Sequence, residues 1–139
     1  QHIQQVLHSV TEDIKLYQQL LVLIQQQKGL YLQFDSKVLD ENIQKQKPIL
    51  NQLARTSSER SQWMRALGLS CNNASMQRIF NALPTKMSVQ VRKQWALLES
   101  LVKQCQQDNQ SNAQSSAAFQ ELITQIKQPV QHTYEEHSV

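Results

Sequence analysis

Apolar residues recur along the first part of the chain with an unbroken helical period. Spacings of four and three residues alternate through Ile3, Leu7, Val10, Ile14, Tyr17, Leu21 and Ile24. This alternation places all seven side chains on one stripe of an α-helix, the heptad seam. The sequence therefore predicts a first long helix over residues 2–34. Asp35 and Ser36 follow, and either can cap the next helix.

The next segment has the same period, but polar residues interrupt it. Its seam contains Leu39, Ile43, Leu50, Leu53, Met64 and Leu67, with Gln46, Ser57 and Arg60 on the same stripe. Pro48 lacks a backbone donor and favours a kink, and the polar stretch 55–62 indicates a solvated middle. We expect a second helix over residues 36–67, ended by Gly68 in the left-handed conformation.

A connector and a longer helix complete the pattern. Ser75 is a suitable cap for a short helix over residues 75–83, which Pro84 ends. The four–three alternation then returns over residues 88–127, through Val91, Trp95, Leu98, Val102, Cys105, Asn109, Asn112, Ser116, Phe119, Ile123 and Ile126. Residues 128–139, which include Pro129, are expected to form a loosely ordered tail.

Asn109, Asn112 and Ser116 form a polar block within this last seam. A buried Asn can fix the register of packed helices, as it does in coiled coils. The block can equally mark a break, beyond which the helix leaves its neighbours. The sequence favours neither interpretation.

Three long segments and one short one, joined by short connections, predict an all-α protein. We expect one domain, either an antiparallel helical bundle or an extended coiled-coil hairpin. The last segment is several turns longer than the first, so its neighbours cannot cover its far end. The sequence therefore predicts an apolar surface that docks an amphipathic helix of another protein. Its candidate residues are Phe119, Leu122, Ile123, Ile126, Val130 and Tyr134.

Composition agrees with a helical fold and limits the function. Only 2 Gly and 3 Pro occur in 139 residues, too few turn formers for a β-rich chain. The 25 Gln residues are interleaved with the apolar period, which favours a weakly charged helical surface. The net charge of +3 comes from Lys and Arg spread along the chain, so we expect no nucleic-acid partner. No apolar run is long enough to cross a membrane.

The sequence contains no residue pattern typical of a metal site or a phosphate-binding loop. No Glu stands three residues before a His, as the di-metal sites of helical bundles require, and 2 Gly cannot form a phosphate-binding loop. Cys71 and Cys105 are interpreted as free thiols of a reducing compartment. The four histidines are interpreted as solvated: His2, His8, His132 and His137. We therefore expect no catalytic residues, no metal and no cofactor.

Several short motifs follow one another in a recognisable order. They are LLVLIQQQKGLYLQFDSKVL, QKPILNQL, RALGLS, FNALP and QWALLESLVKQCQQDNQSNA, which together extend from about Leu20 to Ala113. In this order and spacing the chain resembles the FlgN family of flagellar export chaperones. It departs from the family at Ala113, where a Gly often follows the second Asn, and at Tyr134, which precedes Glu135 and not Gly.

The resemblance implies a cytoplasmic bacterial chaperone without ATPase activity. Its clients would be the late hook–filament junction proteins, held soluble and delivered to the flagellar type III export apparatus. It also implies that the C-terminal region binds the client, which agrees with the surplus length of the last helix. The alternative is a helical sensory or structural coiled-coil domain. The sequence does not decide between a monomer and a homodimer, because heptad seams pack within one chain or between two.

Overall fold

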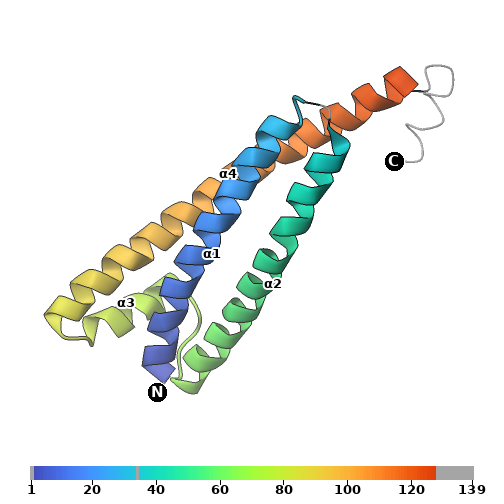
Figure 1. The fold of residues 1–139 in the computed structure, drawn as a ribbon. Helices are drawn as coiled ribbons and strands as arrows, with labels where there is room; N and C mark the ends of the chain where they lie inside the picture. The colour runs from blue at the N-terminus through green and yellow to red at the C-terminus, as the bar shows by residue number, and fades with distance from the viewer. Residues whose placement is uncertain (1, 34, 128–139) are drawn as a thin grey trace.

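The computed structural model describes residues 2–33 and 35–127, and it describes the side chains of the last helix up to Gln114 and that of Ala117. Four helices form this part of the chain: α1 (His2–Leu30), α2 (Ser36–Ala66), α3 (Asn73–Asn81) and α4 (Thr85–Lys127). Figure 1 shows three long helices side by side, with α3 across one end. No strand occurs in the described ranges, so the all-α prediction is confirmed.

Helix α1 lies between the other two long helices. It packs against α2 and against α4, whereas among the described residues α2 and α4 hardly contact each other. Arg60 bonds to Ser9 near the start of α1, and Asn42 donates to the Leu23 carbonyl oxygen near its end at 3.0 Å. These contacts pair the start of each helix with the end of the other, so α1 and α2 are antiparallel.

Helix α4 runs parallel to α1 in one constant register. The Cys105 thiol donates to the Tyr17 carbonyl oxygen at 3.8 Å, and the Asn112 amide donates to the Ile24 carbonyl oxygen at 2.9 Å. Both pairs are 88 positions apart. Consecutive long helices therefore alternate in direction, as a helical bundle with short connections requires.

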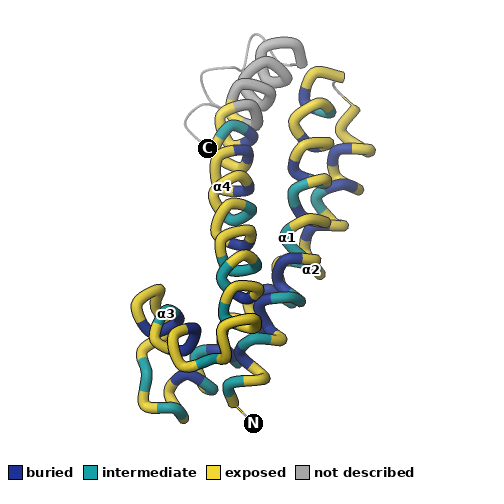
Figure 2. Tube along the Cα trace, turned by 90° about the vertical axis from the view of Figure 1, so that its left-hand side faces the viewer, coloured by how far each residue is buried: buried dark blue, intermediate teal, exposed yellow. Residues whose placement is uncertain are grey.

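The apolar core is thickest at the end where α3 lies. There, all four helices contribute to one buried cluster, which contains Val6, Val10, Ile14, Met64, Met76, Ile79, Phe80, Val91 and Leu98. Further along, the buried apolar clusters shrink to Leu20, Ile24, Leu53 and Cys105, and then to Tyr31 and Leu39. Figure 2 shows the buried positions recurring along the facing sides of the long helices.

The prediction that the first helix continues to residue 34 was wrong. Helix α1 ends at Leu30, and the next residues form a turn in which Leu32 N–H donates to Gly29 O at 3.2 Å and Gln33 N–H to Leu30 O at 3.1 Å. These bonds join residues three apart, the tighter winding with which helices commonly end. Asp35 caps α2 as expected, because its carboxylate accepts from Val38 N–H at 3.2 Å.

Gly68 ends α2 in the predicted left-handed conformation, with φ of 75°. Helix α2 stops at Ala66, one residue earlier than expected, and Leu67 is its C-cap. Leu69 N–H donates to Met64 O and Gly68 N–H to Arg65 O, both at 2.9 Å, which is the Schellman arrangement. Two carbonyls at the helix end are satisfied in this way.

The expected solvated middle of α2 is present on one face of the helix only. Thr56 and Arg60 are buried within the stretch 55–62, because α1 covers that face of α2. Pro48 lies inside the helix, as the sequence requires.

The short helix and the start of the last helix both lie earlier than predicted. Helix α3 spans 73–81 and not 75–83, and its cap is Asn72, whose side chain accepts from Ser75 N–H at 2.8 Å. Ser75 is instead a buried residue inside the helix. Helix α4 begins at Thr85 and not at position 88, because the Pro84 carbonyl accepts the first helical bond, from Ser88 N–H at 2.8 Å.

Candidate partner-binding site

The far end of α4 extends past the other helices. At the constant offset of 88 positions, Leu30 at the end of α1 aligns with position 118, whereas the helix continues to Lys127. Residues 119–127 are therefore the overhang, about 13 Å long at 1.5 Å per residue. Figure 1 shows this end of α4 reaching beyond the turn that joins α1 to α2. The predicted surplus length of the last helix is present in the backbone.

Four of the predicted binding residues fall on the overhang: Phe119, Leu122, Ile123 and Ile126. Their side chains lie outside the described residues, so their grouping on one face rests on the heptad spacing alone. Val130 and Tyr134 also lie outside the described residues, as does the expected tail over 128–139. The structure thus gives the helix on which the first four residues lie, and the binding role stays a prediction.

Asn112 explains how α4 holds its register before the overhang begins. Its side chain is 2% exposed and donates to the main chain of Ile24. Asn109, in contrast, is exposed, and α4 passes through the polar block without a break. Of the two interpretations of the block, the structure therefore supports register at Asn112 and contradicts a helix break.

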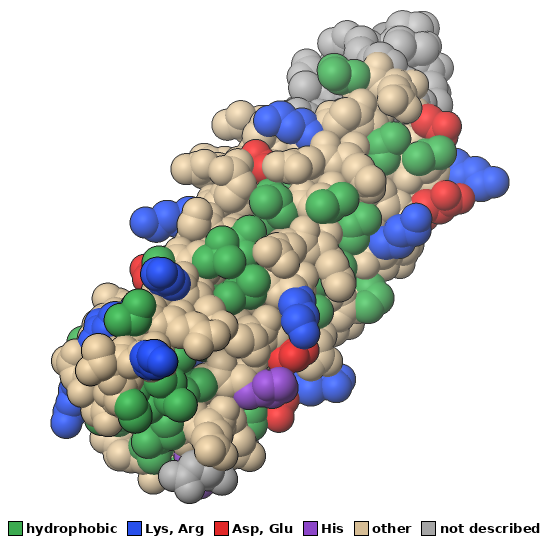
Figure 3. All heavy atoms as spheres, turned by 60° about the vertical axis from the view of Figure 1, so that its left-hand side comes forward, with side chains coloured by type: hydrophobic (Ala, Val, Ile, Leu, Met, Phe, Trp, Pro, Cys, Tyr) green, Lys and Arg blue, Asp and Glu red, His purple; other side chains and the backbone are tan. Residues whose placement is uncertain are grey.

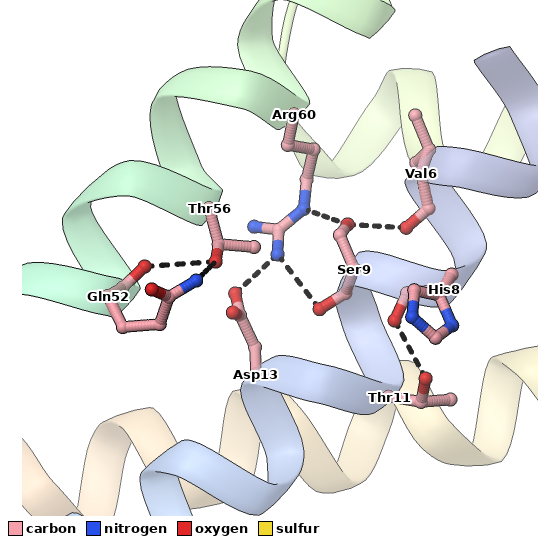
Figure 4. Close-up of polar contacts among 8 residues, drawn as sticks. All are labelled: Val6, His8, Ser9, Thr11, Asp13, Gln52, Thr56 and Arg60. Carbon is pink, nitrogen blue, oxygen red and sulfur yellow. Dashed lines mark hydrogen bonds and ion pairs between the residues drawn. The ribbon is translucent and has the colours of Figure 1, made fainter. Parts of the chain in front are cut away.

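A buried ion pair between Asp13 and Arg60 joins α1 to α2 (Figure 4). The sequence pattern did not predict it. The Arg60 guanidinium donates to the Asp13 carboxylate, to the Ser9 hydroxyl at 2.9 Å and to the Ser9 carbonyl oxygen at 3.4 Å. Burial raises the pKa of the Asp13 carboxyl, although the hydrogen bond and the charge of Arg60 act in the opposite direction. Desolvation therefore outweighs the ion pair, as is common for buried charges.

Polar contacts hold α3 against the first half of α4. Trp95 Nε1 donates to Asn73 Oδ1 at 2.8 Å, and the indole ring meets Phe80 edge-on with centroids 6.3 Å apart. Arg92 donates to Gln77 and to Asn81 and lies 5.6 Å from the centre of the Phe80 ring. Trp95, which lies on the seam of the last helix, is thus a packing residue between α3 and α4.

Metal ligands and cysteines are the remaining candidates for chemistry in the described part of the chain. No group of three or more His, Cys, Asp or Glu side chains that could hold a metal ion occurs there. Cys71 and Cys105 are both free thiols, the first exposed and the second buried. Burial, with a smaller contribution from Asp108, raises the pKa of Cys105 to about 11, so this thiol stays protonated and unreactive near neutral pH. His132 and His137 lie outside the described residues.

The surface is polar, with interspersed apolar side chains. Figure 3 shows hydrophobic side chains in a discontinuous band along the body and in a denser group at one end, with Lys and Arg scattered between them. Among the described residues, the large apolar side chains that are exposed are Val22, Leu32, Val38, Leu50, Met87, Val89 and Leu97. None of the helices, over the residues described, is long and apolar enough to cross a membrane.

Comparison with known proteins identifies the family. The FlgN protein family matches residues 2–136, nearly the whole chain. A search of curated proteins and a search of solved structures returned no match. The family match covers every helix described above, and it agrees with the motifs that resembled the family in the sequence. The chain therefore belongs to the FlgN family of flagellar export chaperones.

Proposed function

We propose that this chain is a cytoplasmic chaperone that binds hook–filament junction proteins through the overhang of α4. It keeps these clients soluble and passes them to the flagellar export apparatus. The family assignment supports an export chaperone in general and favours it over a sensory or structural coiled-coil domain.

One observation carries the choice of site, namely the register between α1 and α4. Asn112 and Cys105 fix the two helices so that the last nine residues of α4 pass the end of α1. Phe119 and Ile126 continue, at seven-residue spacing, the row of Cys105 and Asn112 that bonds to α1 earlier in the helix, but no α1 residue is left at their level. An apolar stripe that extends past the end of α1 suits an amphipathic helix of a client.

Truncation at the register limit tests the site. A chain that ends at Ala118 keeps the Asn112 bond and every described contact with α1, but it lacks the overhang. A second chain that ends at Lys127 keeps the overhang and lacks residues 128–139, including Val130 and Tyr134. We expect calorimetric titration with purified junction proteins to show binding by the longer chain and a loss of about tenfold or more in the shorter one.

Point variants refine this comparison within the full chain. Replacing Ile123 and Ile126 with Gln should weaken client binding, whereas replacing the neighbouring Thr124 and Gln125 with Ala should not. Circular dichroism checks that each variant stays helical. Equal client binding by the native chain and the chain that ends at Ala118 would rule out the overhang as the site.

A further inference from the structure

The interface between α1 and α2 contains pairs of residues that lie at the same level of the two antiparallel helices. Arg60 bonds to Asp13 (Figure 4), and the Gln46 side-chain amide donates to the Gln27 side-chain oxygen at 2.8 Å. The step from the first pair to the second is fourteen residues forward on α1 and fourteen back on α2. All four side chains are buried. The two pairs therefore lie two heptads apart on one continuous interface.

Leu20 and Leu53 lie midway between these two pairs, seven residues from each of them on both helices. They are 3% and 8% exposed and belong to one buried apolar cluster. The interface thus contains a polar, an apolar and a polar pair in turn, at steps of one heptad. We call Asp13 with Arg60, and Gln27 with Gln46, the polar pairs.

The polar pairs distinguish this packing of α2 on α1 from its neighbours. Apolar residues alone do not, because a shift by one heptad replaces each side chain with the next one of the same seam. After a shift in one direction, however, Asp13 is level with Leu53, and after the opposite shift Arg60 is level with Leu20. Either shift leaves a buried charge opposite an apolar side chain, which is strongly unfavourable.

We propose that the two polar pairs select the register in which α2 packs on α1, more than they add to its stability. The attraction within a buried ion pair is offset by the desolvation of both charges, whereas a shifted register leaves both charges without partners. A buried Asn selects the register of coiled coils in the same way, at a cost in stability. The polar pairs thus make one of several similar apolar packings the stable one.

The register of α2 also sets the length of α1. A shift of one heptad is shared between the two helices, so one of the two shifts moves the turn about three to four residues later and lengthens α1 by about 5 Å. Helix α1 would then cover the first part of the overhang of α4. The polar pairs therefore keep the overhang clear of α1, and this consequence alone rests on the proposed function.

Two spin labels measure the register directly in the full chain. Gln5 on α1 and Lys45 on α2 are exposed, and each can be replaced with a spin-labelled noncanonical amino acid. Because Gln46 is level with Gln27, position 45 is level with position 28, and the labels lie about 35 Å apart along the bundle. A shift by one heptad changes this distance to about 24 or about 45 Å. Pulsed electron paramagnetic resonance resolves these distances.

Removal of both polar pairs should release the register. We expect a variant with all four residues made apolar to show a second distance, shifted by about 10 Å. Its changes are Asp13→Leu, Arg60→Met, Gln27→Leu and Gln46→Leu. The control Gln25→Leu with Gln44→Leu adds apolar side chains at exposed positions of the same helices and should keep the single native distance. A single native distance in the four-residue variant would overturn the proposal.

Two further measurements accompany the distances. Circular dichroism checks that the four-residue variant is helical, and if it does not fold, Gln27→Met with Gln46→Met replaces the two Leu changes, because Met adapts to irregular spaces. Light scattering measures the mass, and assembly into dimers in place of a shift within one chain would also overturn the proposal. No client takes part in these measurements, so their outcome is independent of the chaperone function.

Discussion

The Asn112 side chain on α4 donates to the main-chain carbonyl of Ile24 on α1 at 2.9 Å, and this bond lies just before α4 leaves the bundle. Apolar seam residues could pack at more than one helical offset, because neighbouring turns present similar surfaces. A single directional bond to a fixed carbonyl selects one offset. The position at which the overhang begins therefore depends on Asn112.

Loss of this bond should destabilise the chain. We expect Asn112→Ala to lower the free energy of unfolding by about 1–3 kcal/mol, because a buried hydrogen bond and some packing are lost. Urea unfolding measures the change. Asn109→Ala, at an exposed Asn one turn earlier, is the control and should change the free energy by less than about 0.5 kcal/mol. Equal effects of the two changes would contradict the register role.

The ion pair between Asp13 and Arg60 should behave as a unit. We expect Arg60→Met alone to cost about 3–5 kcal/mol of stability, because it leaves a buried carboxylate without its partner. The double change Asp13→Leu with Arg60→Met should be close to neutral or more stable than the native chain, since both desolvation costs disappear. A double-mutant cycle by urea unfolding measures the coupling. Additive losses would show that the two side chains act independently.

The same pair should make stability depend on pH in a defined direction. Burial raises the pKa of Asp13 above 3.8, its ordinary value. The folded chain then holds this proton more tightly than the unfolded chain, so the contribution of Asp13 to stability falls as pH rises from 3.8 through the folded pKa. We expect the stability advantage of the double variant over the native chain to grow as the pH rises from 3.8 through the folded pKa of Asp13. Parallel pH profiles would contradict this account.

The two glycines should respond in opposite ways to replacement by Ala. Gly68 has φ of 75°, a conformation that costs other residues about 1–2 kcal/mol, so Gly68→Ala should destabilise the chain. Gly29 lies in α1 with open space around it, and Gly29→Ala should stabilise the chain by up to about 1 kcal/mol. Thermal unfolding of the two variants under one condition tests both signs.

The sequence predicted the helices well because each long helix repeats its apolar positions with the period of its turn. The lengths of these repeats also predicted the overhang. The burial of Ser9 and Asp13 was not predictable from the repeat. Helix α1 lies between two helices and needs two buried stripes, of which only the apolar one, against α4, is visible as a heptad seam.

The partner of Asp13 could not be read from the sequence either. Arg60 is 47 positions away in a stretch that looks solvated, and only the packing of α2 on α1 brings the two together. The starts of α3 and α4 were misplaced for a local reason. Asn72 and Pro84 begin these helices by accepting backbone bonds, whereas the apolar pattern starts several residues later.

The uneven distribution of the apolar core determines where the molecule unfolds locally. At the α3 end, four helices share one apolar cluster, whereas the opposite end has a few apolar residues and the buried polar side chains Gln27, Asn42, Gln46 and Asn112. Local opening takes place where the fewest apolar contacts must be broken. We therefore expect the three long helices to separate first at the end from which the overhang projects, while the α3 end stays packed.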